Sequence, residues 1–210
     1  MNGNFVTSLV VCVALATQAS AAPQIFIADL SGAAEEPANA SPGTGSTQVT
    51  IDPVAHTLRV IANFSDLMGN STMAHIHVIN GPGDANILDT LGPVATTTPS
   101  FVGFPAGVTS GAYDMTFDTL ASGTYRGGFV TDSAALHPAL TGVEAAELEL
   151  FSAITSGRAY LNIHSTSFPP GEIRGFLVPI PEPASLHLAL ASIVALSAWG
   201  RRRRPGRCKA

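Results

Sequence analysis

Short segments in which apolar and polar residues alternate constrain the fold of this chain most strongly. In residues 58–64 (LRVIANF) every second residue is apolar, so an extended chain would bury one face and leave the other polar. Strands are expected over 24–30, 48–52, 58–64, 74–79, 113–120, 124–130, 160–164 and 172–178. The loops ASG and STSFPPG would join the last four of these into two hairpins. Strands of this length, broken by turns, predict an all-β sandwich or barrel.

Two regions depart from the strand pattern. Residues 80–111 are rich in Gly, Pro and Thr, and we expect a long loop there with at most one short strand. Residues 143–155 (VEAAELELFSAIT) carry an apolar stripe at helical spacing. Gly157 follows this segment where a left-handed C-terminal cap would lie. The sequence therefore predicts one short helix beside the strands.

The two ends of the chain carry the features of export and sorting signals. Residues 1–21 hold an apolar core followed by small residues, which predicts a signal peptide. Residues 179–210 contain a Pro-Glu-Pro turn, an apolar segment and a run of four arginines. This tail resembles the PEP-CTERM sorting signal of bacterial surface proteins, with Pro181, Glu182 and Pro183 as its motif. The resemblance implies an exosortase-type sorting enzyme as partner, transient anchoring in the membrane, and export to the cell surface or beyond; an ordinary tail anchor is the alternative.

Removing both ends leaves one domain, residues 22–178. This domain holds fourteen Asp and Glu residues against four Arg and no Lys, which gives a net charge of −10. A field of that sign repels nucleic acid and anionic membranes, so we expect no nucleic-acid partner. Both cysteines, Cys12 and Cys208, lie in the ends. The stability of the domain must therefore come from packing or from a bound metal.

Four segments carry a resemblance to a known family. In chain order they read ADLSGAAEEPANASPGTGSTQVTIDPVAHTLRV, AHIHVINGPG, SGRAYLNIH and PPGEIRGFL. Together they resemble the CHRD domain, which was first recognised in chordin and is common in bacterial exported proteins, over residues 24–178. The resemblance implies a Greek-key sandwich or barrel related to immunoglobulin-like folds and to copper/zinc superoxide dismutase. The family has no established biochemical activity, so the resemblance implies a fold and little function.

Three histidines are the candidate metal ligands. His75 and His77 share one strand face, because side chains of an extended chain alternate between faces, and His164 ends another strand on its polar face. A His-x-His pair with a distant third histidine resembles three of the four copper ligands of superoxide dismutase, which implies copper or zinc. The sequence offers no histidine for the fourth position and lacks the zinc loop and the Lys-rich guide loop of that enzyme. We therefore expect neither dismutase activity nor another enzymatic function.

Two charged residues are expected beside the histidines. Glu172 and Arg174 alternate with Ile173 and should lie on the polar face of the last strand, with Glu172 opposite His164. There the Glu172 carboxylate would accept the Nδ1–H of a ligand histidine and fix its tautomer. Two alternatives stay open: a hydrogen-bonded polar cluster of the imidazoles with Glu172 and Arg174, without metal, or a solvated pair of Glu172 and Arg174 on the surface.

Three functions are compatible with these features. The first, which the sorting tail favours, is a structural or binding module of the bacterial cell surface or of an extracellular polysaccharide matrix. The second is a copper- or zinc-binding protein. The third is a recognition domain for a secreted protein partner, which rests on analogy with chordin alone.

Overall fold

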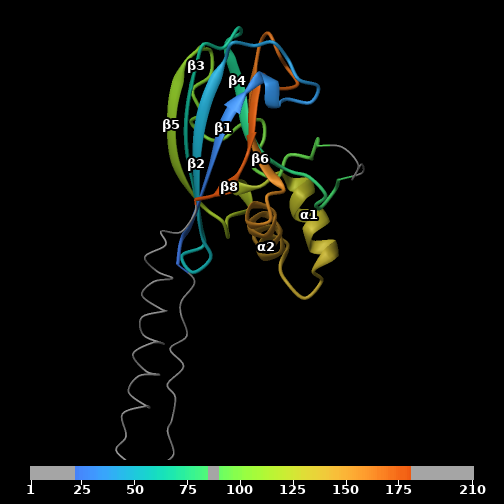
Figure 1. The fold of residues 1–210 in the computed structure, drawn as a ribbon. Helices are drawn as coiled ribbons and strands as arrows, with labels where there is room; N and C mark the ends of the chain where they lie inside the picture. Colours follow the sequence, from blue (N-terminus) through green and yellow to red (C-terminus); the bar gives the residue numbers. More distant parts are fainter. Residues whose placement is uncertain (1–21, 85–89, 181–210) are drawn as a thin grey trace, which may run out of the picture.

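The computed structural model describes residues 22–84 and 90–180 (Figure 1). The expected signal peptide at 1–21 lies outside the described residues, as does the sorting motif of Pro181, Glu182 and Pro183 with the tail that follows it. Within the described ranges, no helix has the length and apolar character needed to cross a membrane.

One antiparallel sheet curls around the apolar core into a half-barrel (Figure 1). Its strand order is β4-β6-β7-β1-β2-β3-β5, and β8 pairs with β1. The strands are β1 (Gln24–Ser31), β2 (Thr44–Asp52), β3 (Thr57–Ser65), β4 (Ser71–Val78), β5 (Gly111–Asp118), β6 (Ala159–Ser165), β7 (Ile173–Phe176) and β8 (Val178–Pro179). The all-β class and the curvature of a sandwich or barrel, both predicted from the sequence, are confirmed.

The inward face of the sheet follows the alternation in the sequence. In β3 the residues Leu58 and Val60 point inward, opposite Ile51 and Val49 of β2. The apolar residues at alternating positions of the expected strands are buried as this pattern predicts: Leu58, Val60, Phe64, Ile76, Val78, Leu161, Ile163 and Ile173. Full burial of such a side chain stabilises the fold by about 1.5–3 kcal/mol. The predicted faces of these strands are therefore correct.

Two α-helices, and not the single predicted one, lie together at one end of the sheet beside β8 (Figure 1). The predicted helix is α2 (Gly142–Thr155). It begins with a capping box, in which Thr141 accepts from the backbone N–H of Glu144 and the Glu144 carboxylate accepts from that of Thr141. It ends before Gly157, whose φ of +71° is the left-handed conformation expected there.

The additional helix, α1 (Gly127–Leu136), replaces a predicted strand. Residues 124–130 were expected to pair with β5 in a hairpin, and this prediction is wrong, because β5 pairs with β3 alone. Phe129 and Ser133, one helical turn apart, are both buried on one face of α1. Two short 3₁₀ helices, η1 (Gly32–Ala34) and η2 (Ser122–Thr124), complete the regular structure of the described residues.

Three loops cover the outer face of β4, β6 and β7. Tyr160 and Asn162 of β6 point away from the core, yet they are only 1% and 2% exposed. The loop before β2 is tied down by the Asn39 amide, which donates to the backbone oxygen of Glu172 over 3.1 Å. The loop before β5 is tied to β4 where the N–H of Ala74 donates to Ser100 Oγ. The sheet thus has an apolar layer inside its curl and a polar layer beneath these loops.

Candidate metal centre

The three candidate histidines come from neighbouring strands and meet in the polar layer. His75 and His77 lie on β4, with Ile76 between them pointing into the core. His164 lies on β6, which pairs with β4 in a register that sets Met73 opposite His164 and Asn162 opposite His75. The structure therefore brings together all three residues that the sequence singled out.

The site is less accessible than the sequence suggested. The predicted polar face of these strands is covered by the loops, so that His75, His77 and His164 are only 3%, 9% and 7% exposed. A buried imidazole loses its hydration, which favours its neutral form. Burial lowers the pKa of His75 and of His77 to about 4, and it lowers the pKa of His164 as well. All three rings are therefore neutral at pH 7.

The imidazole nitrogens converge on a common point. One ring nitrogen from each histidine lies within 4.8 Å of those of the other two. His75 Nδ1 and His164 Nε2 are 3.3 Å apart. The centroid of the His75 ring is 5.2 Å from that of His164 and 5.7 Å from that of His77, and the ring planes are near perpendicular in both pairs. Nitrogens that bind one small ion each lie about 2 Å from it and so at most about 4 Å apart; the His75–His164 distance meets this limit, and the 4.8 Å range of the whole triad is slightly wider.

Backbone carbonyls fix the tautomer of every ring. His77 Nδ1 faces the oxygen of Gly92 at 2.8 Å, and His164 Nδ1 faces the oxygen of Pro169 at 2.9 Å. His75 Nε2 contacts the oxygen of Pro99 in the same way. A carbonyl oxygen only accepts, so the hydrogen-bond network assigns the hydrogen to these three nitrogens. The lone pairs of the neutral rings then lie on the opposite nitrogens, which are His75 Nδ1, His77 Nε2 and His164 Nε2.

These three lone pairs have no donor among the described residues. His77 Nε2 is buried and has no hydrogen-bond partner there. His75 Nδ1 and His164 Nε2 face each other, and both are acceptors in the neutral rings. A hydrogen-bonded cluster without metal would require one ring to be protonated, which burial opposes. The arrangement is electrostatically satisfied by a cation placed between the three nitrogens.

Glu172 does not have the predicted role. Its carboxylate accepts from Ser41 Oγ and from the N–H of Met68, both at 2.5 Å, and from the N–H of Gly69 at 3.4 Å. Glu172 therefore fastens the loops before β2 and β4, while Pro169 holds the tautomer of His164. No sequence signal marks the three carbonyls, because any residue supplies one and only the path of the loop brings it to the ring.

Arg174 is buried, as is Glu172, so the alternative of a solvated surface pair of these two residues is wrong. Its guanidinium donates to the oxygens of Ala34 and Thr90 and lies 4.8 Å from the centre of the Tyr160 ring. Tyr160 in turn stacks on His77 with a centroid distance of 4.9 Å. Arg174 thus reaches the histidine triad through Tyr160 and not through Glu172.

Glu35 is a site residue that the sequence reasoning missed. One of its oxygens lies 3.8 Å from Arg174 Nε, and the other is buried with no hydrogen-bond partner among the described residues. Burial raises the pKa of Glu35 to about 7, although the charge of Arg174 acts in the opposite direction. The sequence EEP at residues 35–37 is only a weak signal for a buried carboxyl group. Nothing in it distinguishes Glu35, which is buried, from Glu36, which is exposed.

Comparison with known proteins identifies one family. A model described as the CHRD domain matches residues 26–177, which is most of the chain. No curated protein and no solved structure gives a match. All strands except β8 and the first two residues of β1, together with the three histidines, lie within the matched range.

Proposed function

The chain belongs to the CHRD domain family, and we propose that its domain binds one copper or zinc ion through His75, His77 and His164. Each histidine would contribute one nitrogen: Nδ1 of His75 and Nε2 of the other two. Imidazole nitrogens are common ligands of both metals. The proposed role is to hold the metal, and no chemical reaction is assigned to it.

One observation carries this proposal: the opposing acceptors His75 Nδ1 and His164 Nε2, 3.3 Å apart in a buried site. Two lone pairs at this distance repel each other unless a proton or a cation lies between them. Burial lowers the pKa of His75 and His164 and so disfavours the proton. The carbonyls of Pro99 and Pro169 keep both rings from turning these nitrogens away.

The first prediction is that the full chain, freed of metal with a chelator, takes up one copper or zinc ion. Binding should raise the free energy of unfolding, by about 2.7 kcal/mol when the free ion is at 100 times its Kd. Metal analysis after gel filtration and thermal unfolding with and without the ion would measure both effects.

Matched variants locate the ion. The double variant His75→Gln/His164→Gln should lose the bound ion and the metal-dependent rise in Tm. The double variant His56→Gln/His137→Gln removes the same number of imidazoles from pairs with Glu147 and Glu149, away from the triad, and should keep both. A wild-type chain that takes up neither metal, or a triad variant that keeps its ion, would contradict the proposal.

A second function, compatible with the first, is a structural module of the cell surface. The Pro-Glu-Pro turn, apolar segment and arginine run support it. We propose that an exosortase-type enzyme removes the tail and that the exported domain then contacts matrix polysaccharide or a secreted protein. β8 lies beside β1, with Pro179 opposite Phe26, so a C-terminal anchor would hold the domain at the end where both chain termini leave the sheet.

The second prediction tests this processing. Cleavage near the Pro-Glu-Pro turn should give a surface protein whose C-terminus lies close to Pro183. Intact-mass measurement of material from the native host would detect it. A mass that still includes Cys208 and Lys209 would leave only an uncleaved tail anchor.

A further inference from the structure

We infer that the triad prefers monovalent copper to zinc and to divalent copper. The inference rests on the proposed function, since it names the ion that the same site takes.

The ligand set is the first argument. Among the described residues, only the three histidines form a cluster that could hold a metal, and no carboxylate or thiolate joins them. Zinc in structural sites takes four ligands, and divalent copper favours a square-planar or tetragonal arrangement. Monovalent copper has a filled d shell and is stable with three nitrogen donors. Three donors held rigidly by carbonyls therefore satisfy monovalent copper, whereas zinc or divalent copper would need a further ligand, such as water, inside a site that the loops cover.

The charge around the site is the second argument. The cost of burying an ion rises with the square of its charge, so a divalent ion needs negative groups nearby. Tyr160 stacks on His77, and the positively charged guanidinium of Arg174 lies over the Tyr160 ring, which makes it the charged group of this stack. Glu35 beside it is held partly protonated near neutral pH, and the ionised Glu172 carboxylate makes its hydrogen bonds to Ser41 and Met68 and not to a histidine of the triad. The surroundings thus supply little charge to balance a divalent ion.

The side chain next to the triad is the third argument. Met73 lies two residues before His75 on the same face of β4 and is paired with His164 across the sheet. Directly opposed residues have their Cβ atoms about 5 Å apart. A thioether is a soft donor that selects monovalent copper over zinc. We assign Met73 a supplementary contribution to the affinity for monovalent copper.

The experiment compares the three ions on the full chain. Monovalent copper is titrated without oxygen in competition with bicinchoninate, and zinc and divalent copper are titrated against chromogenic chelators. We expect monovalent copper to bind at least 100-fold more tightly than zinc and more tightly than divalent copper. The triad variant His75→Gln/His164→Gln should lose this affinity, and His56→Gln/His137→Gln should keep it. Cys12 and Cys208 are present in every variant, so the difference reports the triad alone.

The outcomes separate the inference from the proposed function. Equal or tighter binding of zinc or divalent copper at the triad would overturn the preference and leave a metal-binding protein. Absence of binding for all three ions would overturn both. If the triad variant fails to fold, X-ray absorption of the copper-loaded wild type decides, since three-coordinate monovalent copper has a characteristic edge.

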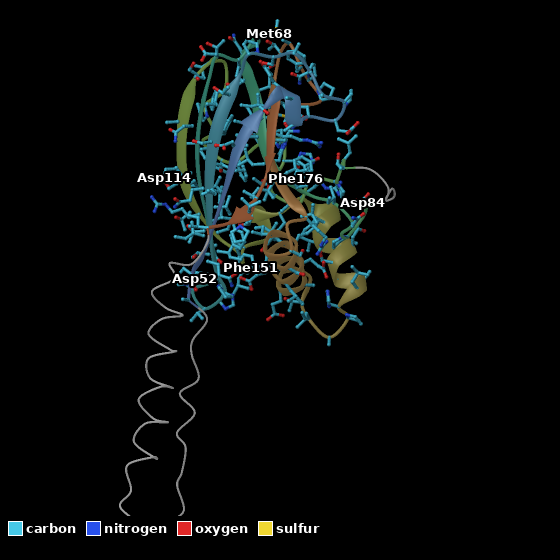
Figure 2. The ribbon with its side chains drawn as sticks, viewed as in Figure 1. Asp52, Met68, Asp84, Asp114, Phe151 and Phe176 are labelled. Carbon is cyan, nitrogen blue, oxygen red and sulfur yellow. The ribbon has the colours of Figure 1, made fainter. Side chains whose placement is uncertain are left out.

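A methionine pair tests the third argument. Met73→Leu should weaken the binding of monovalent copper several-fold while leaving zinc binding unchanged. Met68→Leu is the control, because Met68 is exposed at the far end of the domain from the helices (Figure 2). Equal copper affinity in both variants would remove Met73 from the site.

Discussion

At the scale of single residues, Gly92 is needed because its backbone must touch β4. A Cβ at this position would lie 2.2 Å from the oxygen of Val78, a distance that no packed structure tolerates. The third prediction is that Gly92→Ala displaces the loop, so that the Gly92 oxygen leaves His77 Nδ1. Loss of such a contact typically weakens metal binding 10- to 100-fold, and chelator competition would measure it.

The control for Gly92→Ala is Gly123→Ala. A Cβ at Gly123 meets no atom within 4 Å, so this variant adds the same methyl group without a clash. It should bind metal as the wild type does. Full metal affinity in Gly92→Ala would show that the Gly92 carbonyl does not orient His77.

The sequence predicted the three histidines that cluster in the structure, but not the groups that support them. The alternation in AHIHVI places His75 and His77 on one face, and this local rule holds in β4. Glu172 was misassigned because register alone put it opposite His164, while its carboxylate is used by Ser41 and two backbone N–H groups. Such choices depend on how the loops pack, which has no periodic signal in the sequence.

At the scale of secondary-structure elements, α1 shows where local propensity failed. The segment TYRGGFV is rich in β-branched and aromatic residues and contains two glycines, so a strand was the reasonable expectation. Packing decided otherwise: Phe129 is fully buried, and α1 lies against α2. The helix α2 was predicted because its apolar stripe and its terminal glycine agree, and the structure adds a capping box at its start.

The fourth prediction concerns the start of α2. Thr141→Ala removes the side chain that accepts from the N–H of Glu144, and loss of such a cap costs about 1 kcal/mol in the free energy of unfolding. Urea unfolding of the metal-free chain would measure the change. Thr131→Ala, at an exposed position inside α1, should cost much less, because alanine is the better helix former. Equal costs for the two variants would argue against the capping box.

At the scale of the whole molecule, the sheet was predicted more completely than its covering. Alternating segments identify a buried face, and they led to the correct core from Leu58 in β3 to Ile173 in β7. The same alternation implied a solvated outer face, whereas β4, β6 and β7 are covered on both sides. Loops covering a sheet leave no alternation of their own, so the buried position of the histidine triad could not be predicted.

Because His75, His77 and Glu35 are buried, the stability of the metal-free domain depends on pH in two opposing ways. Burial lowers the pKa of His75 and His77 from 6.5 to about 4, so between these values the unfolded chain binds more protons and stability rises with pH. Burial raises the pKa of Glu35 from 4.5 to about 7, so over that window the folded chain binds more protons and stability falls with rising pH. With two histidines against one carboxyl group, we expect a maximum near pH 7.

The fifth prediction separates the two contributions with Glu35→Gln. This variant cannot titrate at position 35, so its stability relative to the wild type should increase as the pH rises from 4.5 to 7, by roughly 3 kcal/mol at most. Any constant cost of losing the ion pair with Arg174 shifts the whole curve and leaves this slope unchanged. Urea unfolding at several pH values with a chelator present would measure it, with Glu36→Gln as the control at the exposed neighbouring position. A difference between Glu35→Gln and wild type that stays constant with pH would mean that Glu35 is ionised in the folded domain, and the site would then hold a negative charge able to balance a divalent ion.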